Sequence, residues 1–247
     1  MCRKTYFEAI ISIVMARKTI TIKETLPKLA SLMDLLSAEE HEVFEQRMTL
    51  HAFRRNEIIY SEGDASTYLH CLIAGKVKIQ KEGVGGRPQI VRVIKPVDLF
   101  GYRAAFAGQN YASGALAFEP SVVVRIPMST IISTLTENPR LGWFFIERLS
   151  KDLGRADERT VNLTQKHIRG RLAESLLFLR DSYGLEEDGS TLSIYLSRED
   201  LANLSNMTTS NAIRTLSAFA QEKIIAIDGK KIKLLDIPKL EKINRIG

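Results

Sequence analysis

Residues 196–222 read LSREDLANLSNMTTSNAIRTLSAFAQE, and this stretch predicts two short helices joined by a sharp turn. Ser197, followed by three charged residues, is a good N-cap, and leucines three residues apart give the first helix a buried face. Asn206 stands at the turn, because asparagine tolerates the left-handed backbone conformation better than most other non-glycine residues. Thr208 is expected to cap the second helix, which runs to about Glu222.

The second helix has two different faces. Its apolar residues point to one side, while the other side carries hydroxyls, an amide and a single arginine, and no acidic residue. Phosphates and base edges in the DNA major groove offer mostly hydrogen-bond acceptors, and arginine can form a bidentate pair with guanine. The sequence therefore predicts that this face binds DNA. The predicted contacts are Thr208, Thr209, Ser210, Asn211 and Arg214.

Residues 224–235, IIAIDGKKIKLL, predict two strands around an Asp-Gly hairpin turn. Lys230, Lys231 and Lys233 would lie beside the DNA backbone and attract phosphates without reading sequence. A helical hairpin alone, or a lysine-bearing β-hairpin alone, is common in proteins that bind no DNA. The order helix, turn, helix, hairpin favours a winged helix-turn-helix.

Upstream, residues 53–127 alternate between short apolar segments and turn residues. Many short strands with regular punctuation are typical of a small antiparallel β-sandwich or barrel. Residues 27–47, by contrast, have helical spacing, and Ser37 with Glu40 forms a capping box, so two short helices should precede the strands. The predicted strands cover residues 57–60, 68–73, 76–79, 90–94 and 122–126.

Residues 139–165 predict one long helix between the strands and the DNA-binding unit. Side chains at spacings of three and four form a rough coiled-coil seam along it. A second copy of the chain could cover this seam, but packing on the chain's own barrel explains the apolar face equally well. A further helix over 168–183 and a strand over 192–195 should follow. The seam residues are Phe145, Leu149, Leu153, Ala156, Thr160, Leu163 and His167.

The overall composition is that of a globular protein of about two domains, with 247 residues, 45% of them apolar and 26% charged. The formal net charge of +6 permits nucleic acid as a partner without requiring it. Cys2 and Cys71 are the two cysteines, so one chain cannot assemble a disulfide framework, a four-cysteine metal site or an iron–sulfur cluster. We expect a reducing, cytoplasmic setting.

The N-terminus contains a short apolar run between basic residues. Arg17 and Lys18 follow it where a signal peptide needs small residues. An N-terminal extension over residues 1–27, or translation that starts at Met15 and leaves residues 1–14 outside the native protein, therefore fits better than a signal peptide. No other segment approaches the roughly 18 apolar residues needed to span a membrane, so no membrane attachment is expected.

The motifs taken together resemble one known family. The run from Leu196 to Ala202, Thr208 and residues 214–216 are similar to the helix-turn-helix of the cyclic AMP receptor protein and FNR regulators. Residues 63–64, 75–79, 98–101 and 170–173 resemble the same family's β-roll turns and the helix after its hinge, and the resemblance spans residues 29–240.

This resemblance implies an α+β fold with three parts after the N-terminal extension. A cyclic-nucleotide-binding-like β-roll, or jelly roll, would occupy residues 28–137 as the sensor domain. A dimerisation helix and hinge would occupy 138–168, and a C-terminal winged helix-turn-helix 169–247.

The resemblance also implies a function. It predicts a homodimeric transcription regulator, with no enzymatic activity, that binds a pseudo-palindromic operator in double-stranded DNA and works with RNA polymerase. Arg214 matches the family arginine that contacts a guanine in each half-site, and Thr208 matches the capping residue. Thr209 and Ser210 replace an arginine and a glutamate of several members, so the operator should differ from theirs. Ser205 and Thr215 occupy positions that are usually apolar.

The sensor pocket departs further from the family pattern. In members that bind cyclic AMP, a glutamate follows the glycine matching Gly101, and an Arg-Ser pair holds the cyclic phosphate; this chain has Tyr102 and Ala112-Ser113. A buried phosphate without its arginine costs on the order of several kcal/mol. We therefore expect an effector other than cyclic AMP, or none. The candidate effector pocket comprises Gly101, Tyr102, Arg103, Tyr111 and Ser113.

Other chemistries stay open at this stage. Haem could bind through His41, His51, His70 or His167, although a lone histidine is more often a packing or surface residue. A cupin-like metal enzyme is a rival interpretation, which the dispersed histidines disfavour because such enzymes need clustered ligands. A ligand-controlled interaction module that does not bind DNA is the second rival.

Overall fold

The computed structural model describes residues 21–83, 86 and 88–247, so Cys2, Met15 and most of the expected N-terminal extension lie outside the described residues. The chain divides into two compact units. The first comprises residues 1–82 and 91–151, and the second residues 83–90 and 152–247.

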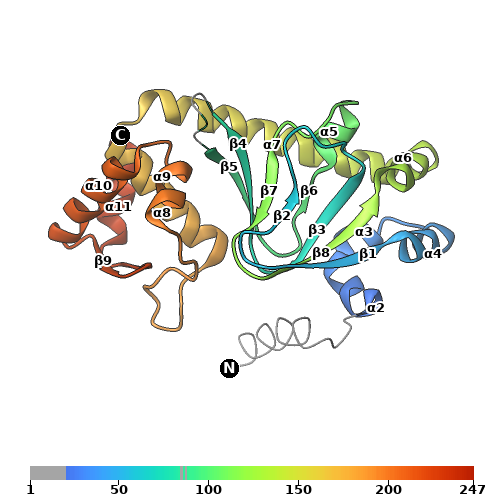
Figure 1. The fold of residues 1–247 in the computed structure, drawn as a ribbon, viewed down its shortest axis with the longest axis horizontal. Helices are drawn as coiled ribbons and strands as arrows, with labels where there is room; N and C mark the ends of the chain where they lie inside the picture. Colours follow the sequence, from blue (N-terminus) through green and yellow to red (C-terminus); the bar gives the residue numbers. More distant parts are fainter. Residues whose placement is uncertain (1–20, 84–85, 87) are drawn as a thin grey trace. The chain divides into compact units, whose positions relative to one another are not determined.

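Two four-stranded sheets form the centre of the first unit (Figure 1). One has the strand order β1-β8-β3-β6 and the other β2-β7-β4-β5. The pairs β1–β8, β3–β8, β3–β6, β2–β7 and β4–β7 are all antiparallel. The strands are β1 (Thr49–Phe53), β2 (Ile58–Tyr60), β3 (Tyr68–Ala74), β4 (Val77–Glu82), β5 (Pro88–Ile94), β6 (Leu99–Phe100), β7 (Gly114–Ala117) and β8 (Ser121–Pro127).

The five predicted strands are confirmed, each within a few residues of its expected bounds. Strands β1, β6 and β7 were not predicted. The two-residue β6 is too short to show alternation, and β7, GALA, consists of small residues and one leucine that give no strand signal by themselves.

The first unit has two apolar cores on opposite faces of the β1-β8-β3-β6 sheet. Between the sheets pack residues from strands of both, among them Phe53, Tyr60, Leu72, Phe100 and Val123. On the other face, alternate residues of β3 and β8 pack against helices; this core includes Leu69, Cys71, Val124, Phe44, Ile131 and Phe145. Side chains alternate across a strand, so β3 serves both cores at once.

The helices of this unit supply the second core. They are α2 (Ile22–Thr25), the 3-10 helix η1 (Leu26–Leu29), α3 (Ala30–Met33), α4 (Ala38–Arg47), α5 (Tyr102–Phe106), α6 (Met128–Glu137) and the start of α7 (Pro139–Gln165). The Ser37 hydroxyl accepts from the backbone N–H of Glu40, and the Glu40 carboxylate accepts from the N–H of Ser37. The predicted capping box is confirmed.

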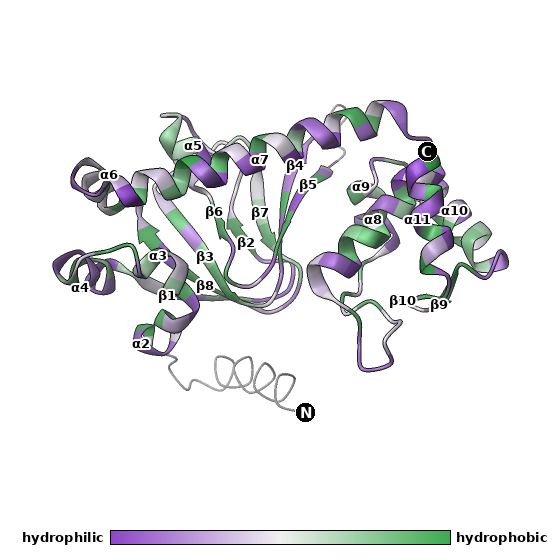
Figure 2. Ribbon diagram, turned by 180° about the vertical axis from the view of Figure 1, so that it is seen from behind, coloured by the Kyte–Doolittle hydropathy of each residue, from purple (hydrophilic) through white to green (hydrophobic). Residues whose placement is uncertain are grey.

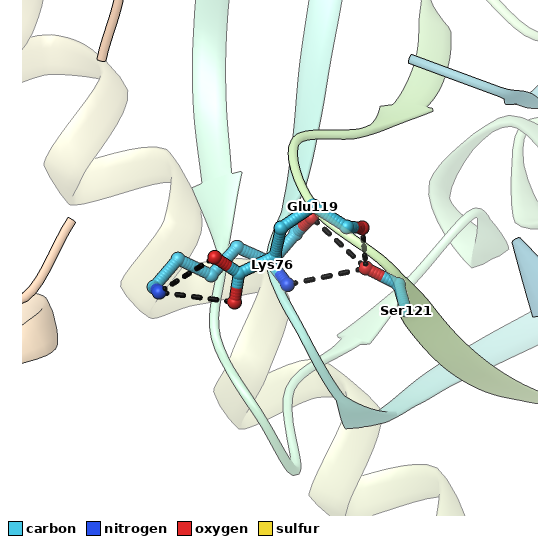
Figure 3. Close-up of polar contacts among 3 residues, drawn as sticks. All are labelled: Lys76, Glu119 and Ser121. Carbon is cyan, nitrogen blue, oxygen red and sulfur yellow. Dashed lines mark hydrogen bonds and ion pairs between the residues drawn. The ribbon is translucent and has the colours of Figure 1, made fainter. Parts of the chain in front are cut away.

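The turns between strands are tied to one another. Lys76 donates to both carboxylate oxygens of Glu119 at 3.0 Å, and its backbone N–H donates to the Ser121 hydroxyl at 3.2 Å (Figure 3). Gly75 precedes this contact with φ +92°, and a Cβ there would collide with the Ser121 Oγ. The β3–β4 and β7–β8 turns therefore fit together only because residue 75 has no side chain.

Helix α7 matches its predicted bounds, but the predicted seam needs a correction. Phe145 is buried in the helix-side core and Leu149 packs against it, so this unit already covers the start of the seam. The exposed large apolar residues of α7 are Trp143, Ile146, Leu153 and Val161, and of these only Leu153 belongs to the predicted seam. Figure 2 shows hydrophobic and hydrophilic residues alternating along α7.

The second unit continues with α8 (Ile168–Tyr183), α9 (Arg198–Leu204), α10 (Thr209–Gln221), the hairpin β9 (Ile225–Asp228) and β10 (Lys231–Leu234), and α11 (Ile237–Ile246). The predicted strand over 192–195 is wrong, because only Leu192 forms an isolated bridge there, with Leu185. Helix α11 was not predicted, although Asp236 as N-cap and Pro238 in the first turn are a recognisable start signal.

Candidate nucleic-acid interface

The α9-turn-α10 unit has the local geometry that its sequence predicts. The Ser197 hydroxyl accepts from the N–H of Asp200, and the Thr208 hydroxyl accepts from the N–H of Asn211, so both helices have side-chain N-caps. Asn206 adopts φ +50°, the left-handed conformation expected at the sharp turn. A short first helix and a longer second helix are thereby fixed at their starts.

The inner side of α10 anchors it to its own unit. Ala212, Leu216 and Phe219 are almost fully buried, as predicted. At the other end of the helix, the Arg169 guanidinium lies 4.9 Å from the Phe219 ring centroid and donates two hydrogen bonds, of 2.8 and 2.9 Å, to the Glu222 carboxylate. This bidentate pair ties the end of α10 to the start of α8.

Ser205 and Thr215, which occupy usually apolar positions, are both buried. The Ser205 hydroxyl bonds the Ser175 hydroxyl of α8 at 2.8 Å. A buried hydroxyl would be costly if it were unpaired, and Ser175 supplies the partner. The departure at Ser205 is therefore matched by a polar residue on the facing helix.

The outer side of α10 presents the predicted contact residues. Thr208, Thr209, Ser210 and Arg214 are exposed and Asn211 is half-buried, so all five predicted residues lie at or near the start of α10 with at least part of each side chain accessible. Arg214 donates from Nη2 to the Asn211 Oδ1 at 2.5 Å. The amide of Asn211 therefore holds the guanidinium of Arg214.

The β9–β10 hairpin, called the wing from here on, turns one residue later than predicted. Asp228 pairs with Lys231, so the two turn residues are Gly229 and Lys230 rather than Asp228 and Gly229. Gly229 has φ +55°, which suits the first position of such a turn. Lys230 is consequently at the tip of the wing.

Arg198, which is not among the predicted contact residues, fixes this tip. Its Nη2 donates to the backbone carbonyl of Gly229 at 2.8 Å, which joins the first residue of α9 to the wing turn. An arginine directly after an N-cap is an ordinary helix-start residue, so no local pattern marks this contact. The wing tip is held to the helix-turn-helix by a side chain 31 residues away.

The wing lysines are not equivalent. Lys231 lies 3.8 Å from the Glu186 carboxylate and Lys233 3.2 Å from that of Asp188, whereas Lys230 has no carboxylate within ion-pair distance among the described residues. Both acids belong to the loop between α8 and α9. The hydrogen bonds from Thr191 and Ser190 to the Asp188 carboxylate keep the pKa of that group well below its usual range.

The five candidate effector residues do not lie together. Tyr102 is fully buried in the helix-side core, with its ring 5.3 Å from that of Phe145. Tyr111 is in the core between the sheets, stacked 3.8 Å from the Tyr60 ring, and its hydroxyl donates to the Tyr68 carbonyl. Arg103 is exposed and Ser113 half-buried. The sheet separates the two tyrosines.

Gly101 is needed at its position because of His70. It adopts φ +86°, and a Cβ there would lie 2.6 Å from the His70 Nδ1. His70 is 2% exposed among the rings of Tyr60 and Phe100, and its Nδ1 has no hydrogen-bond partner among the described residues. Burial, with the positive charge of Arg125 nearby, lowers the pKa of His70 to about 3.

Comparisons with known proteins agree with this architecture. The sequence pattern of the cyclic nucleotide-binding domain matches residues 50–138, and that of the Crp-like helix-turn-helix domain matches residues 170–243. Together they cover more than half of the chain. The chain belongs to the cyclic AMP receptor protein and FNR (Crp/Fnr) family of transcription regulators.

Curated Crp/Fnr relatives cover most of the chain at modest identity. The CRP-like cAMP-activated global transcriptional regulator of Mycobacterium tuberculosis is 25% identical over 189 residues, which are 76% of this chain and 84% of that protein. The global nitrogen regulator of Nostoc sp. is 27% identical over 199 residues, 77% of this chain and 89% of that protein. One of these relatives is named for activation by cAMP and the other for nitrogen regulation, so family membership does not identify the effector.

Solved Crp/Fnr structures share the fold. FixK2 from Bradyrhizobium japonicum has a TM-score of 0.72 at 22% identity and covers 80% of this chain and 97% of its own. A transcriptional regulator of the CRP family from Thermus thermophilus has a TM-score of 0.67 at 25% identity, with 79% of this chain and 96% of its own covered.

The histidines that could have served a haem or metal in this Crp/Fnr protein are dispersed. His41 lies 3.3 Å from Glu45 on α4, His51 bonds the Thr49 hydroxyl on β1, and His167 is the N-cap residue of α8. Within residues 21–83, 86 and 88–247, no three His, Cys, Asp or Glu side chains gather as a metal-ligand cluster. In the same part of the chain, no helix combines the length and hydropathy of a membrane span.

Proposed function

We propose that this Crp/Fnr protein acts as a homodimer that places its two α10 helices in successive major grooves of a pseudo-palindromic operator. Residues 28–137 serve as the sensor domain, 138–168 as the dimerisation helix and hinge, and 169–247 as the DNA-binding domain. Its role is regulation of transcription, together with RNA polymerase in the cytoplasm, and it catalyses no reaction.

The main observation that supports this proposal is the exposed Arg214 on a helix without acidic residues. Its guanidinium can donate two hydrogen bonds to the O6 and N7 of guanine. Thr208, Thr209 and Ser210 supply hydroxyls to bases or phosphates on either side. The partner of Arg214, Asn211, restricts the arginine before DNA arrives, which reduces the side-chain entropy lost on binding.

Wing residues add contacts to the backbone. Lys230 is exposed at the tip of the wing and would contact a phosphate, and Lys231 would do so when its ion pair with Glu186 opens. These contacts position the protein without reading bases.

The exposed stripe of α7 supports the homodimer. Trp143, Ile146 and Leu153 are 70%, 52% and 64% exposed, and Val161 continues the same side of the helix. Their spacings of three, seven and eight residues are close to the heptad repeat of a two-helix seam. A second copy of α7 would bury all four side chains.

The effector, on this proposal, is not cyclic AMP. Tyr102 stands where the nucleotide-binding glutamate would be, and it is fully buried. Ala112 replaces the arginine that would hold the phosphate. Any effector acts by favouring one arrangement of the two units over the other, through a difference in affinity for the two.

The test compares Arg214→Ala and Arg214→Lys with the unmodified protein on an operator selected from random duplexes. The alanine variant should lose about 1–3 kcal/mol of binding free energy, and selectivity should relax at one base pair in each half-site. The lysine variant keeps the charge but loses the bidentate geometry, so it should retain more affinity for random DNA and still lose discrimination.

Two results would contradict the proposal. If the unmodified full-length protein showed no preference for any DNA sequence at moderate salt, the proposed function would be wrong. Unchanged selectivity at every base pair in both variants would remove the role of Arg214 while leaving the function in place.

A further inference from the structure

Residues 184–192, the first part of the loop between α8 and α9, are built onto the wing. Leu192 donates its N–H to the Ile232 carbonyl at 2.9 Å, and Leu234 donates to the Ser190 carbonyl at 2.8 Å. Thr191 forms an antiparallel bridge with Lys233. Residues 190–192 thus lie along β10 as a third short strand. Residues 184–192 are called the acidic loop from here on, because they contain Glu186, Glu187 and Asp188.

This placement brings carboxylates to the outward side of β10. Ile232 and Leu234 are buried, so Lys231 and Lys233 point away from the core, as alternation along a strand requires. Both outward lysines meet the acidic loop, Lys231 at Glu186 and Lys233 at Asp188.

Backbone hydrogen bonds between the acidic loop and β10 hold the carboxylates near the lysines. The loop closes on itself as well, because Glu186 donates its N–H to the Thr191 carbonyl at 2.7 Å and Gly189 donates to the Glu186 carbonyl at 2.9 Å. The carboxylates are therefore held next to the lysines in the free protein.

We infer that the acidic loop is an internal competitor for DNA phosphate, which occupies two wing lysines and thereby weakens the sequence-independent part of DNA binding. This inference rests on the proposed function. Each lysine must exchange a carboxylate for a phosphate, whereas Lys230 at the tip has no such exchange to make among the described residues.

The exchange has a specific signature in salt. A lysine that newly neutralises a phosphate releases counterions and steepens the plot of log affinity against log salt by about 0.9. A paired lysine contributes less, because its own carboxylate already neutralises part of its charge. The cost of opening the pairs is the same on every duplex, so operator and random DNA should be affected equally.

Glu186 is the appropriate position for the test. Asp188 also accepts hydrogen bonds from Ser190 and Thr191, so changing it would disturb the loop. The side chain of Glu186 meets Lys231, while its loop-closing bonds are made by the backbone. Glu187, exposed in the same loop and outside ion-pair distance of the wing lysines in the described chain, is the matched control.

The experiment measures the affinity of the full-length protein for the operator and for a random-sequence duplex across a roughly fourfold range of salt, from about 50 to about 200 mM. Glu186→Gln should bind both duplexes more tightly at low salt. Its affinity should fall by a further factor of about 3.5 across this range for each wing that gains a phosphate contact. Glu187→Gln makes the same charge change and should alter the salt slope much less.

Lysine variants complete the cycle. Lys230→Gln should reduce the salt slope by about 0.9 per wing and Lys231→Gln by clearly less, because Lys231 is already paired. In the Lys231→Gln background, Glu186→Gln should have no more effect than Glu187→Gln. Equal effects of the two glutamate variants in the unmodified background, or equal effects of the two lysine variants, would overturn the inference. Absence of sequence preference in the unmodified protein would instead overturn the proposed function.

Discussion

Acidification should destabilise the first unit through one buried side chain, His70. Its ring is 2% exposed, and the charged and aromatic groups around it are the Arg125 guanidinium of β8, His51 of β1 and the rings of Tyr60, Tyr68, Phe100 and Tyr111. Burial raises the pKa of Tyr111 to about 12, so that phenol carries no compensating negative charge at neutral pH. The folded protein therefore holds His70 neutral.

The magnitude follows from the two pKa values. The imidazole has a pKa of about 3 in the folded state and 6.5 ordinarily. Below pH 6.5 the imidazole is protonated in the unfolded chain but stays neutral in the folded chain, so the free energy of unfolding decreases as the pH falls, until about pH 3. Each unit of pH in this window costs about 1.4 kcal/mol, and the loss from about pH 7.5 to about pH 5 is about 2 kcal/mol.

Urea unfolding followed by circular dichroism at these two pH values measures this loss in the unmodified protein and in His70→Phe. Phenylalanine keeps an aromatic ring against Phe100 and cannot be protonated. Other titrating groups are common to both proteins, so the unmodified protein should lose about 2 kcal/mol more than the variant on acidification. Equal losses would refute the reasoning, because they would mean that His70 takes up its proton in the folded state.

Three further predictions concern positions fixed by local geometry. Gly75→Ala should lower the free energy of unfolding by about 1–3 kcal/mol through backbone strain, and by more through the contact with Ser121. Gly63 has nearly the same φ and no atom within 4 Å of a new Cβ, so Gly63→Ala should show the strain alone. Thermal unfolding compares the two variants. Thr208→Ala should lower the stability of the second unit by about 1 kcal/mol through loss of the α10 cap, and Thr208→Ser should restore it; larger or unrescued losses would contradict a capping role. Cys71 is fully buried and its thiol pKa is raised to about 12, so a maleimide should label it only after unfolding, and rapid labelling of the native protein would contradict its burial.

The DNA-binding unit was the most predictable part of the fold because its signals are local. Caps at Ser197 and Thr208, the left-handed Asn206 and the two faces of α10 each depend on residues within a few positions of one another. The contacts that hold the unit together are not local. Arg198 reaches the Gly229 carbonyl and Ser175 reaches Ser205 across long separations in sequence, and a single sequence does not pair such residues.

The roles of the individual wing lysines could not be predicted from the sequence. Lys230 and Lys231 are neighbours of the same type, and the sequence assigns them one role. Their surroundings differ because the turn begins at Gly229, which leaves Lys230 at the tip and places Lys231 on β10 near Glu186. A one-residue shift in a hairpin turn thus decides which lysine faces a carboxylate.

The long helix was predicted in extent but not in orientation. Spacings of three and four residues define a stripe along one side of a helix. Over the 27 residues of α7, neighbouring stripes fit these spacings almost equally well, so the sequence does not decide which one is buried. Phe145 belongs to the core because the neighbouring rings of Tyr102 and Phe106 pack on it. The stripe left exposed is consequently the one through Trp143 and Ile146.

The same packing changes the meaning of the residue at position 102. In Crp/Fnr members that bind cyclic AMP, a glutamate follows the glycine that matches Gly101. Here Phe100 packs between the sheets, Gly101 takes φ +86°, and the Tyr102 ring lies on the opposite side of the sheet against Phe145 of α7. Replacing a carboxylate by this ring exchanges a polar group for apolar contacts in the helix-side core. Tyr102 therefore contributes, together with Phe106, to the packing of α7 on this unit.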